Sequence, residues 1–389
     1  MIRPLGWAVV GFPVVGVVGG GQLARMMAPA AVTLGVRLRV LAADPGESAA
    51  QVVPDTVLGH HTDLDALRRF ADGCDVVTFD HEHVPPAHLE ALMADGVAVR
   101  PGPAALVHAQ DKGVMRAALA AAGVPCPRWA LVSTVAQLRE FGAATGWPVV
   151  VKTTRGGYDG KGVRLVTVAE EAADWLARVP VTGHRLLAEE RVPFTRELAA
   201  LVARSPHGQA VAYPVVETVQ VDGVCREVVA PARIADGHAV AAQRAALLIA
   251  GALDVTGVLA VELFDTPDGV LVNELAMRPH NCGHWSIEGA VTSQFENHLR
   301  AVLDLPLGSP AALASRVVMV NVLGGDHPEM FSAYRHVMAR DPAAKVHMYG
   351  KAVRPGRKVG HVTVAGDDVD DLLERGRHAA SYLRGDLLP

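Results

Sequence analysis

The 389-residue chain has little of what defines several common protein classes. It holds only four cysteines, and no two of them form a Cys-x-x-Cys pair, so neither a redox motif nor a cysteine zinc site is indicated. A formal net charge of -5 argues against a general nucleic-acid-binding protein. No repeat with a period of about 20 to 50 residues recurs, which argues against a solenoid. The four cysteines are Cys74, Cys126, Cys225 and Cys282.

The chain also lacks an uninterrupted apolar run that is typical of a membrane span. Its N-terminal stretch is apolar, but Gly6, Gly11 and Pro13 interrupt it, and no small-residue cleavage site follows. We interpret residues 1–13 as an extension before the first strand. Because scattered cysteines without pairing motifs are typical of a reducing compartment, we expect a cytoplasmic protein without a membrane partner. A content of 50% apolar and 20% charged residues predicts a globular chain rather than a disordered one.

Strand and helix signals alternate along the first hundred residues. Short apolar runs at Val14–Val18, Val36–Leu41 and Val76–Phe79 are separated by helical spacing at Gln22–Leu34 and Leu64–Phe70. This βαβαβ order predicts an open parallel sheet that is covered by helices.

Proline and glycine clusters divide the rest of the chain. One continuous helical region, Ala104–Ala122, is expected between two such breaks, and strands and hairpins dominate further on. We therefore predict an α/β domain at 14–108, a small lid at 109–195 and a C-terminal α+β domain at 196–389. The fold class is α/β combined with α+β.

A glycine-rich turn follows the first predicted strand. Gly19-x-Gly21-x-x-Ala24 opens a helix, and Asp44 lies about twenty residues further on, which matches the dinucleotide fingerprint. Glycines at this position allow backbone N–H groups to approach an anion at the helix N-terminus. Three interpretations stay open: a nicotinamide site, a site for another phosphorylated ligand, which we favour, and a plain tight turn.

A second glycine-rich segment lies between two strands. Val149–Lys152 and Val163–Val166 flank Gly156-Gly-Tyr-Asp-Gly-Lys-Gly162, and Lys161 is followed by glycine rather than by the serine or threonine of a P-loop. A hairpin flap of this kind folds over a polyphosphate with its N–H groups exposed, and Lys152 supplies a point charge at its base. The alternative is a flexible surface hairpin.

Two glutamates occupy the two arms of a predicted hairpin, Val258–Leu275. If even positions pair with even positions, Glu262 and Glu274 project from the same face, flanked by Phe264 and Val272. Two carboxylates that converge with phosphate oxygens are how Mg²⁺ is usually held. The alternative is that each carboxylate faces water or a lysine.

Four further polar segments suit charged small molecules. Asp80–His83 follows the third strand of the α/β domain, where substrate contacts are expected. Carboxylates in Glu189–Glu197 are able to accept hydrogen bonds from a ribose, although a solvated loop would look similar. Arg278–Trp285 suits an anionic reactant better than zinc, and Lys351–Lys358 predicts a clamp for a phosphate monoester, with a solvated basic loop as the alternative. Together these segments predict an enzyme that uses ATP to activate one reactant and attach it to a phosphorylated second one.

These segments resemble the ATP-grasp superfamily and, within it, the N5-carboxyaminoimidazole ribonucleotide synthetases of purine biosynthesis. The resemblance runs from about Val14 to about His361 and implies an ATP-grasp architecture. It implies a carbon–nitrogen ligase that carboxylates 5-aminoimidazole ribonucleotide with bicarbonate, through carboxyphosphate, and releases ADP and phosphate. It rests on Gly20-Gly-Gln-Leu-Ala-Arg-Met26, Ala109-Gln-Asp-Lys112, the flap, Asn273-Glu-Leu275, Arg278-Pro-His-Asn-Cys-Gly-His-Trp285 and Arg354-Pro-Gly-Arg-Lys-Val-Gly-His361.

The resemblance also implies residue roles, position by position. Glu262 and Glu274 would hold Mg²⁺, or Mn²⁺ in its place. ATP would be held by Lys112, Lys152, Gly156, Gly157, Tyr158, Asp159, Gly160, Lys161, Gly162, Glu189, Glu190, Arg191, Val192, Glu197, Gln220, Asn273 and Glu274. The ribonucleotide would be held by Gln22, Glu82, Tyr158, Lys351, Arg357 and Lys358.

Three residues are candidates for the chemical step. Arg278 and His280 are assigned to the carboxyphosphate anion from their position, and Asp159 to the proton of the reacting amine. Gln220 stands where some relatives have a nucleotide-contacting histidine. The resemblance further implies a homodimer.

Three alternatives to this function stay open. The nearest is another ATP-grasp ligase, such as a formate-dependent glycinamide ribonucleotide transformylase. A nicotinamide dehydrogenase built on the first glycine turn would leave Glu262 and Glu274 without a role. A catalytically inactive nucleotide-binding protein is the third, and Lys152 together with the two glutamates argues against it.

Overall fold

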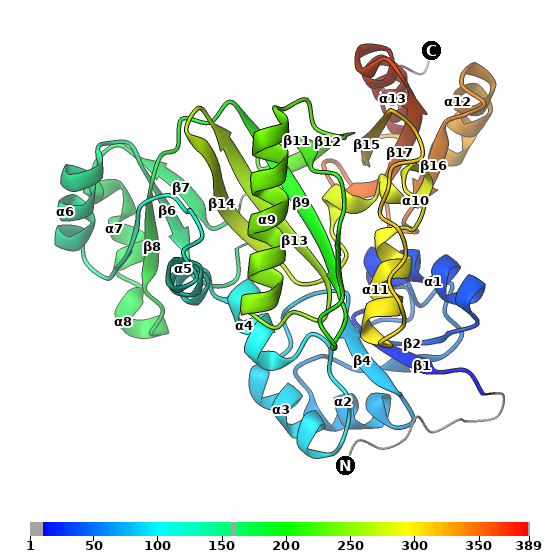
Figure 1. Cartoon of the computed structure of the whole chain (residues 1–389), viewed down its shortest axis with the longest axis horizontal. Coiled ribbons are helices and arrows are strands. Elements are labelled where there is room, and N and C mark those ends of the chain that lie inside the picture. Colours follow the sequence, from blue (N-terminus) through cyan, green and yellow to red (C-terminus); the bar gives the residue numbers. More distant parts are fainter. Residues whose placement is uncertain (1–10, 158–160, 388–389) are drawn as a thin grey trace.

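The computed structural model describes residues 11–157 and 161–387. These residues form three β-sheets that follow one another along the chain (Figure 1). Within the described ranges, no helix has the length and apolar character that crossing a bilayer requires.

The first sheet is parallel and has the strand order β3-β2-β1-β4. Strands β1 and β4 are buried along their whole length and almost wholly apolar, because helices cover both faces of such a sheet. The open parallel α/β unit predicted from the sequence is confirmed, with the short β3 as an addition. The elements are β1 (Val14–Val18), α1 (Gln22–Leu34), β2 (Arg37–Ala42), β3 (Thr56–Leu58), α2 (Leu64–Ala71), β4 (Val76–Phe79) and α3 (Pro86–Ala94).

Two helices connect this sheet to the next one, where the sequence predicts a single helical region over Ala104–Ala122. That prediction is wrong at Asp111, where α4 (Pro103–Gln110) ends and α5 (Lys112–Ala121) begins. The Asp111 side chain accepts hydrogen bonds from the N–H groups of Gly113 (2.9 Å) and Val114 (3.2 Å). An N-cap of this kind starts a new helix in a new direction.

The second sheet is antiparallel, with the order β5-β8-β6-β7, and it carries the glycine flap. It lies at one end of the molecule, beside the large sheet (Figure 1). Short helices pack on it around their own apolar core, which includes Leu138, Val151 and Leu176. The elements are β5 (Trp129–Val132), α6 (Val135–Thr145), β6 (Val149–Thr153), β7 (Val163–Val166), η1 (Ala169–Ala172), α7 (Ala173–Leu176), α8 (Val179–Thr182) and β8 (Leu186–Glu190).

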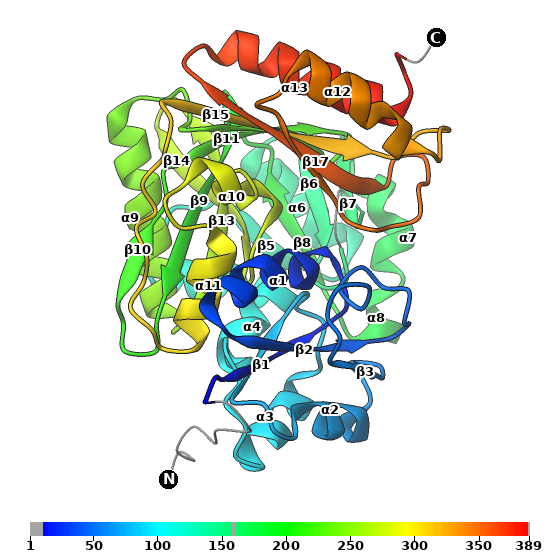
Figure 2. The ribbon, with the colours of Figure 1, turned by 90° about the vertical axis from the view of Figure 1, so that its right-hand side faces the viewer.

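The third sheet has nine strands, in the order β14-β13-β9-β11-β12-β15-β17-β16, and β10 pairs with β9. Helix α9 lies across one face of this sheet in Figure 1, and α12 and α13 cover its C-terminal end in Figure 2. Its strands are β9 (Arg196–Arg204), β10 (Ala210–Ala212), β11 (Val216–Val221), β12 (Val224–Ala230), β13 (Gly257–Thr266), β14 (Gly269–Ala276), β15 (Arg316–Leu323), β16 (Lys345–Met348) and β17 (Lys358–Gly366). Its helices are α9 (Asp236–Ala252), η2 (Asn281–Gly283), α10 (Ser286–Gly289), α11 (Gln294–Val302), η3 (Met330–Ala333), α12 (Tyr334–Arg340) and α13 (Val369–Arg384).

A buried histidine joins the first sheet to the third. His298 on α11 accepts a hydrogen bond at Nδ1 from the N–H group of Val258 (3.1 Å), so its proton lies on Nε2, 2.8 Å from Thr78 Oγ1 on β4. Burial lowers the pKa of His298 to about 3. The imidazole therefore stays neutral in the folded chain at every pH at which the protein is ordinarily handled.

This histidine predicts a pH dependence of stability. Between about pH 6.5 and pH 3 the unfolded chain binds a proton at His298 that the folded chain does not bind, so stability is lost as the pH falls below 6.5. His298→Gln should therefore flatten the dependence of the unfolding free energy on pH by about 1.4 kcal/mol per pH unit. Urea unfolding between pH 7 and pH 5 measures this slope. The exposed control variant His184→Gln should keep the wild-type slope, and an equal slope in His298→Gln would contradict the assignment.

Candidate active site

A cleft of about 1600 Å³ is lined by residues from all three sheets and their loops. It gathers most of the residues that the sequence predicts for the site. Gly162 does not line it, and Tyr158, Asp159 and Gly160 lie outside the described residues. The predicted residues that line the cleft are Gln22, Glu82, Lys112, Lys152, Gly156, Gly157, Lys161, Glu189, Glu190, Arg191, Val192, Glu197, Gln220, Glu262, Asn273, Glu274, Arg278, His280, Lys351, Arg357 and Lys358.

The strands on either side of the flap form an antiparallel hairpin. Lys152 pairs with Val163 at its last rung, and the N–H group of Thr153 donates to the carbonyl of Gly162 at 2.9 Å. Gly156 and Gly162 have φ angles of 77° and 75°, a backbone conformation that favours glycine. The hairpin thus holds Lys152 at the base of the flap, as the sequence predicts.

Glu262 and Glu274 lie directly opposite each other on β13 and β14. Beyond them the register shifts, so that Leu263 pairs with Val272 and Asn273 becomes the extra residue of a β-bulge. The bulge lets Asn273 and Glu274, which are neighbours in the chain, both line the cleft. Val272 instead packs in the core with Leu263, so the prediction that it flanks the carboxylates is wrong.

The carboxylates in the cleft strongly affect one another. Burial, together with the charges of Glu274 and Glu197, raises the pKa of Glu262 to about 7. Lys112 Nζ contacts Glu274 Oε1, and His280 Nε2 lies 3.6 Å from Glu262 Oε1. A hard divalent cation fits this excess of negative charge. Within the described ranges, no group of three or more His, Cys, Asp or Glu side chains could hold a metal, so a cation here would need ligands from a substrate.

Glu189 on β8 is buried, and both of its oxygens are engaged by cations. Arg116 Nε lies 2.5 Å from Oε1, and Lys152 Nζ lies 2.6 Å from Oε2. Burial alone would raise the pKa of Glu189, but Lys152 and Arg116 lower it below its ordinary value. Arg116 is not among the residues predicted from the sequence, because nothing in an apolar helix marks a single arginine as facing inward.

The next two glutamates differ sharply in their surroundings. Glu190 accepts hydrogen bonds from the N–H group of Arg128 (2.9 Å) and from its Nε (2.6 Å). Glu197 on β9 has no hydrogen-bonding or ion-pair partner for its side chain among the described residues, and burial raises its pKa. Of the three carboxylates predicted to meet a ribose, Glu197 is therefore the one that is available.

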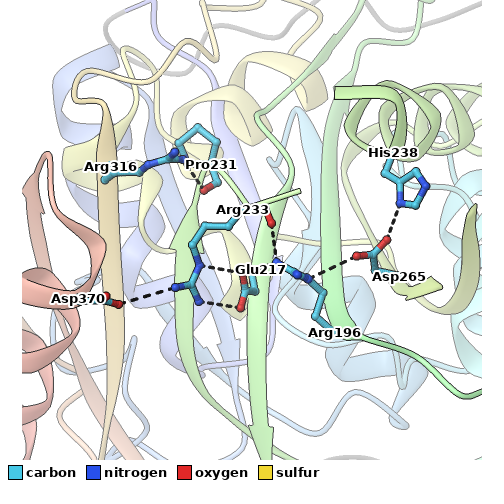
Figure 3. Close-up of polar contacts among 8 residues, drawn as sticks. All are labelled: Arg196, Glu217, Pro231, Arg233, His238, Asp265, Arg316 and Asp370. Atoms are coloured by element: carbon cyan, nitrogen blue, oxygen red, sulfur yellow. Dashed lines mark hydrogen bonds and ion pairs between the residues drawn. The ribbon is translucent and has the colours of Figure 1, made fainter. Parts of the chain in front are cut away.

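Strand β9, which carries Glu197, is held by an ion-pair network around the neighbouring residue Arg196 (Figure 3). Glu217 on β11 contacts Arg196 at 3.4 Å and Arg233 at 3.0 Å. Asp265 on β13 contacts Arg196 at 3.4 Å and His238 Nδ1 at 2.6 Å. Because Arg196 directly precedes Glu197, this network holds the start of β9 against both of its neighbours.

At the other end of the cleft, Glu82 joins the loop after β4 to the segment that follows β14. It accepts hydrogen bonds from Arg278 Nε (2.8 Å) and from the N–H group of Met277 (3.1 Å). Gln294 holds the backbone of His280 at both its N–H group (2.9 Å) and its carbonyl (2.8 Å). Burial lowers the pKa of His280 well below its ordinary value, so His280 offers a neutral N–H donor and Arg278 is the permanent cation beside it.

At the first glycine turn, carboxylates from distant parts of the chain occupy two of the backbone amides. The N–H groups of Gly20 and Ala24 donate to Glu47 Oε2 (3.1 Å) and to Asp80 Oδ1 (2.9 Å). A Cβ on Gly21 would come within 2.0 Å of Asp80 Oδ2. The missing side chain of Gly21 thus lets Asp80 approach the turn closely. Gln22 of the same turn lines the cleft, so its interpretation as part of a site for a phosphorylated ligand stays a prediction.

The basic segment Lys351–Lys358 places three of its four cations in the cleft. Lys351, Arg357 and Lys358 line it, whereas the exposed Arg354 does not. Lys351 Nζ contacts Gln22 Oε1, so the loop between β16 and β17 meets the start of α1.

Comparison with protein-family models divides the chain into three matching regions. A ribonucleotide synthetase preATP-grasp domain matches residues 13–110, and an ATP-grasp domain matches residues 117–295. A phosphoribosylaminoimidazole carboxylase C-terminal domain matches residues 317–375.

Curated relatives extend over nearly the whole chain. The N5-carboxyaminoimidazole ribonucleotide synthase of Mycobacterium bovis is 57% identical over 376 residues, which cover 95% of this chain and 88% of the relative. The chain belongs to the N5-carboxyaminoimidazole ribonucleotide synthase family. A member of this family from Corynebacterium ammoniagenes is 48% identical over 96% of this chain and 93% of its own length.

Solved structures of N5-carboxyaminoimidazole ribonucleotide synthases have the same fold. The enzyme of Thermus thermophilus superposes with a TM-score of 0.85 at 40% identity, over 96% of this chain and 99% of that chain. The Aspergillus clavatus enzyme, solved with ADP and 5-aminoimidazole ribonucleotide, has a TM-score of 0.86 at 33% identity, over 96% of this chain and 98% of that chain.

Membership of the synthase family decides between the functions that the sequence left open. The predicted ATP-grasp architecture and the predicted ATP-dependent ligase of purine biosynthesis are confirmed. The dehydrogenase, the inactive nucleotide-binding protein and the formate-dependent transformylase are excluded as functions.

The carboxylate pair leads to a test of the predicted metal site. Glu274→Gln keeps the shape of the side chain but removes its charge, so ATP turnover should fall by more than about a hundredfold. The free energy of unfolding should change by less than about 1 kcal/mol, because the Glu274 side chain is 39% exposed and the amide oxygen of glutamine still accepts a hydrogen bond from Lys112. ADP release and urea unfolding measure the two effects. Asp268→Asn, in the exposed turn of the same hairpin, is the control, and wild-type turnover in Glu274→Gln would refute the metal assignment.

Proposed function

We propose that this cleft uses ATP to carboxylate 5-aminoimidazole ribonucleotide with bicarbonate, and that it yields N5-carboxyaminoimidazole ribonucleotide, ADP and phosphate. The observation that carries the proposal is that one cleft brings three groups together. They are Lys152 at the base of the flap, the carboxylates of Glu262 and Glu274, and the cations of the basic segment Lys351–Lys358. A triphosphate and a phosphate monoester therefore have separate cationic sites, with Arg278 and His280 also in the cleft.

In this proposal the nucleotide lies between the lid and the large sheet. Lys152 and the amides of the flap face the phosphates, and Glu197 accepts hydrogen bonds from the ribose hydroxyls. Glu189 and Glu190 act mainly through the backbone at this position, because their carboxylates are already engaged. Gln220 also lines the cleft and is able to both donate and accept hydrogen bonds there.

Glu262 and Glu274 would hold Mg²⁺, or Mn²⁺, together with oxygens of the triphosphate. Such a cation would neutralise the negative charge on the transferring phosphoryl group. Lys112, in contact with Glu274, keeps that carboxylate pointed into the cleft.

The reaction then has two balanced steps. An oxygen of bicarbonate attacks the γ-phosphorus, and the bond from that phosphorus to the bridging oxygen breaks, so that carboxyphosphate and ADP form. The exocyclic amine of the ribonucleotide takes the carboxyl group, phosphate leaves, and the amine loses a proton. Arg278 and the N–H group of His280 stabilise the anion. Asp159, which lies outside the described residues, stays our candidate for the proton acceptor. Closure of the lid would keep water from carboxyphosphate.

Two broader parts of the proposal concern the cell and the assembly. The four cysteines are free, which supports a reducing, cytoplasmic location. The homodimer rests on the family resemblance alone, and light scattering of the purified protein tests it.

The reaction is tested by product analysis. With ATP, ribonucleotide and ¹⁴C-bicarbonate, we expect one ADP and one phosphate for each labelled product molecule. Leaving out either bicarbonate or the ribonucleotide should remove labelled product. Labelled formate is the matched control, and its incorporation, or the absence of product from bicarbonate, would overturn the proposal.

The phosphate clamp gives a separate prediction. Lys358→Ala should raise the KM for the ribonucleotide by about tenfold or more, because a charge-assisted hydrogen bond to phosphate is lost. The KM for ATP should stay within about twofold of wild type, since the clamp faces the other substrate. Steady-state kinetics with each substrate varied in turn measure both values. Arg354→Ala, just outside the cleft, is the control, and equal shifts in both KM values would contradict the assignment.

A further inference from the structure

The guanidinium of Arg116 is wholly buried at the junction between the lid and the large sheet. Its side chain has 0% exposure, which is rare for a charged residue. It lies on the buried face of α5 beside Met115 and Leu119, and it does not line the cleft. No role for Arg116 follows from substrate contact.

Each nitrogen of this guanidinium has a partner. Nε lies 2.5 Å from Glu189 Oε1 on the lid strand β8. Nη1 donates to the carbonyl of Val272 at 2.9 Å, and Nη2 donates to the carbonyl of Asn273 at 2.8 Å. One planar fork therefore bridges the lid and the edge strand of the large sheet.

The two carbonyls show how Arg116 acts on the bulge. Consecutive carbonyls of a regular strand point toward opposite edges, so a single fork reaches both only where the strand is bulged. Asn273 is the extra residue of that bulge, and β14 is the edge strand of its sheet. The N–H group of Val272 donates to the carbonyl of Pro125 at 2.9 Å. Arg116 and Pro125 together hold the backbone that turns Asn273 and Glu274 into the cleft.

The contact between Arg116 and Glu189 also affects Lys152, at the base of the flap. Glu189 is shared by Arg116 and by Lys152, whose Nζ also lies 2.9 Å from Asn273 Oδ1. Arg116, Glu189, Lys152 and Asn273 thus form a closed ring with two positive charges and one negative charge, in which Asn273 takes part through both its side chain and its backbone carbonyl. Because Arg116 takes up part of the charge of Glu189, Lys152 keeps a net positive potential toward the cleft.

We propose that Arg116 is a positioning residue for ATP: by sharing Glu189 it keeps that carboxylate from cancelling the charge of Lys152 toward the cleft, and through two carbonyls it fixes the bulge that presents Asn273 and Glu274. This inference rests on the proposed function for the identity of the nucleotide. It adds that the lid and the metal-binding hairpin are aligned by a side chain that touches no substrate.

Three variants separate the two actions of Arg116. Arg116→Met leaves Glu189 to Lys152 alone and frees both carbonyls, so ADP should bind about tenfold more weakly and turnover should fall at least as much. Arg116→Lys keeps a charge for Glu189 but cannot span all three acceptors, so ADP affinity should recover more than turnover does. In Arg116→Met with Glu189→Gln, no carboxylate competes with the phosphates for Lys152, so ADP affinity should rise above that of Arg116→Met while turnover stays low.

The measurements are calorimetric titration with ADP alone, and kcat and both KM values for the full reaction. Arg375→Met is the matched control, because Arg375 pairs with Asp341 at 2.8 Å and neither residue lines the cleft. The KM for the ribonucleotide should stay within about twofold in every variant. Urea unfolding gives the folded fraction, and if Arg116→Met does not fold, Arg116→Lys carries the test.

Several outcomes would overturn the inference. One is ADP affinity and turnover of Arg116→Met or Arg116→Lys within twofold of the Arg375→Met control. Another is a fall in turnover that only follows the folded fraction, with ADP affinity unchanged, which would make Arg116 purely structural. A wild-type protein that binds ADP but makes no carboxylated product would instead refute the proposed function and leave the ADP titrations to judge Arg116.

Discussion

Two positive charges share one buried carboxylate where the lid meets the large sheet. A lysine that is to face phosphates must be partly buried, yet burial of an isolated charge is costly and would neutralise it. Glu189 offsets that cost for Lys152, and Arg116 prevents Glu189 from cancelling the lysine altogether. The lid strands, the connecting helix and the edge of the large sheet all converge on this point, so their relative placement depends on it.

The cleft itself forms because irregular or terminal parts of three sheets face one another. The polar residues of the first domain follow β4, at the carboxyl edge of the parallel sheet, and Glu82 there is tied to Arg278 of the third domain. The lid contributes its hairpin, and the large sheet contributes its bulged edge hairpin. Sheet interiors have no such positions, since their backbone groups are paired and their side chains are packed.

The differences between sequence and structure have a common cause. The turn at Gly19–Ala24 has the local pattern of an anion site, but Glu47 and Asp80, distant in the chain, occupy the amides of Gly20 and Ala24. Val272 was placed beside the carboxylates by strict alternation, and a one-residue bulge sends it into the core. The carboxylate of Glu189, which local sequence offers to a ribose, is taken by Arg116. In each case a long-range partner overrides a pattern that is correct locally.

Much of this protein follows from the amino-acid order alone. Short apolar runs and glycine or proline breaks determine β1, β4, α1 and the flap hairpin, because these depend on side-chain periodicity and on local backbone freedom. The segments around Lys152, Glu274 and Lys358 likewise carry enough chemistry to indicate an ATP-dependent ligase. Only the tertiary structure decided which carboxylate stays available, which amides of the first glycine turn are occupied and which arginine faces inward. Those outcomes depend on burial and on charges brought together from distant positions, and no single stretch of sequence contains both partners.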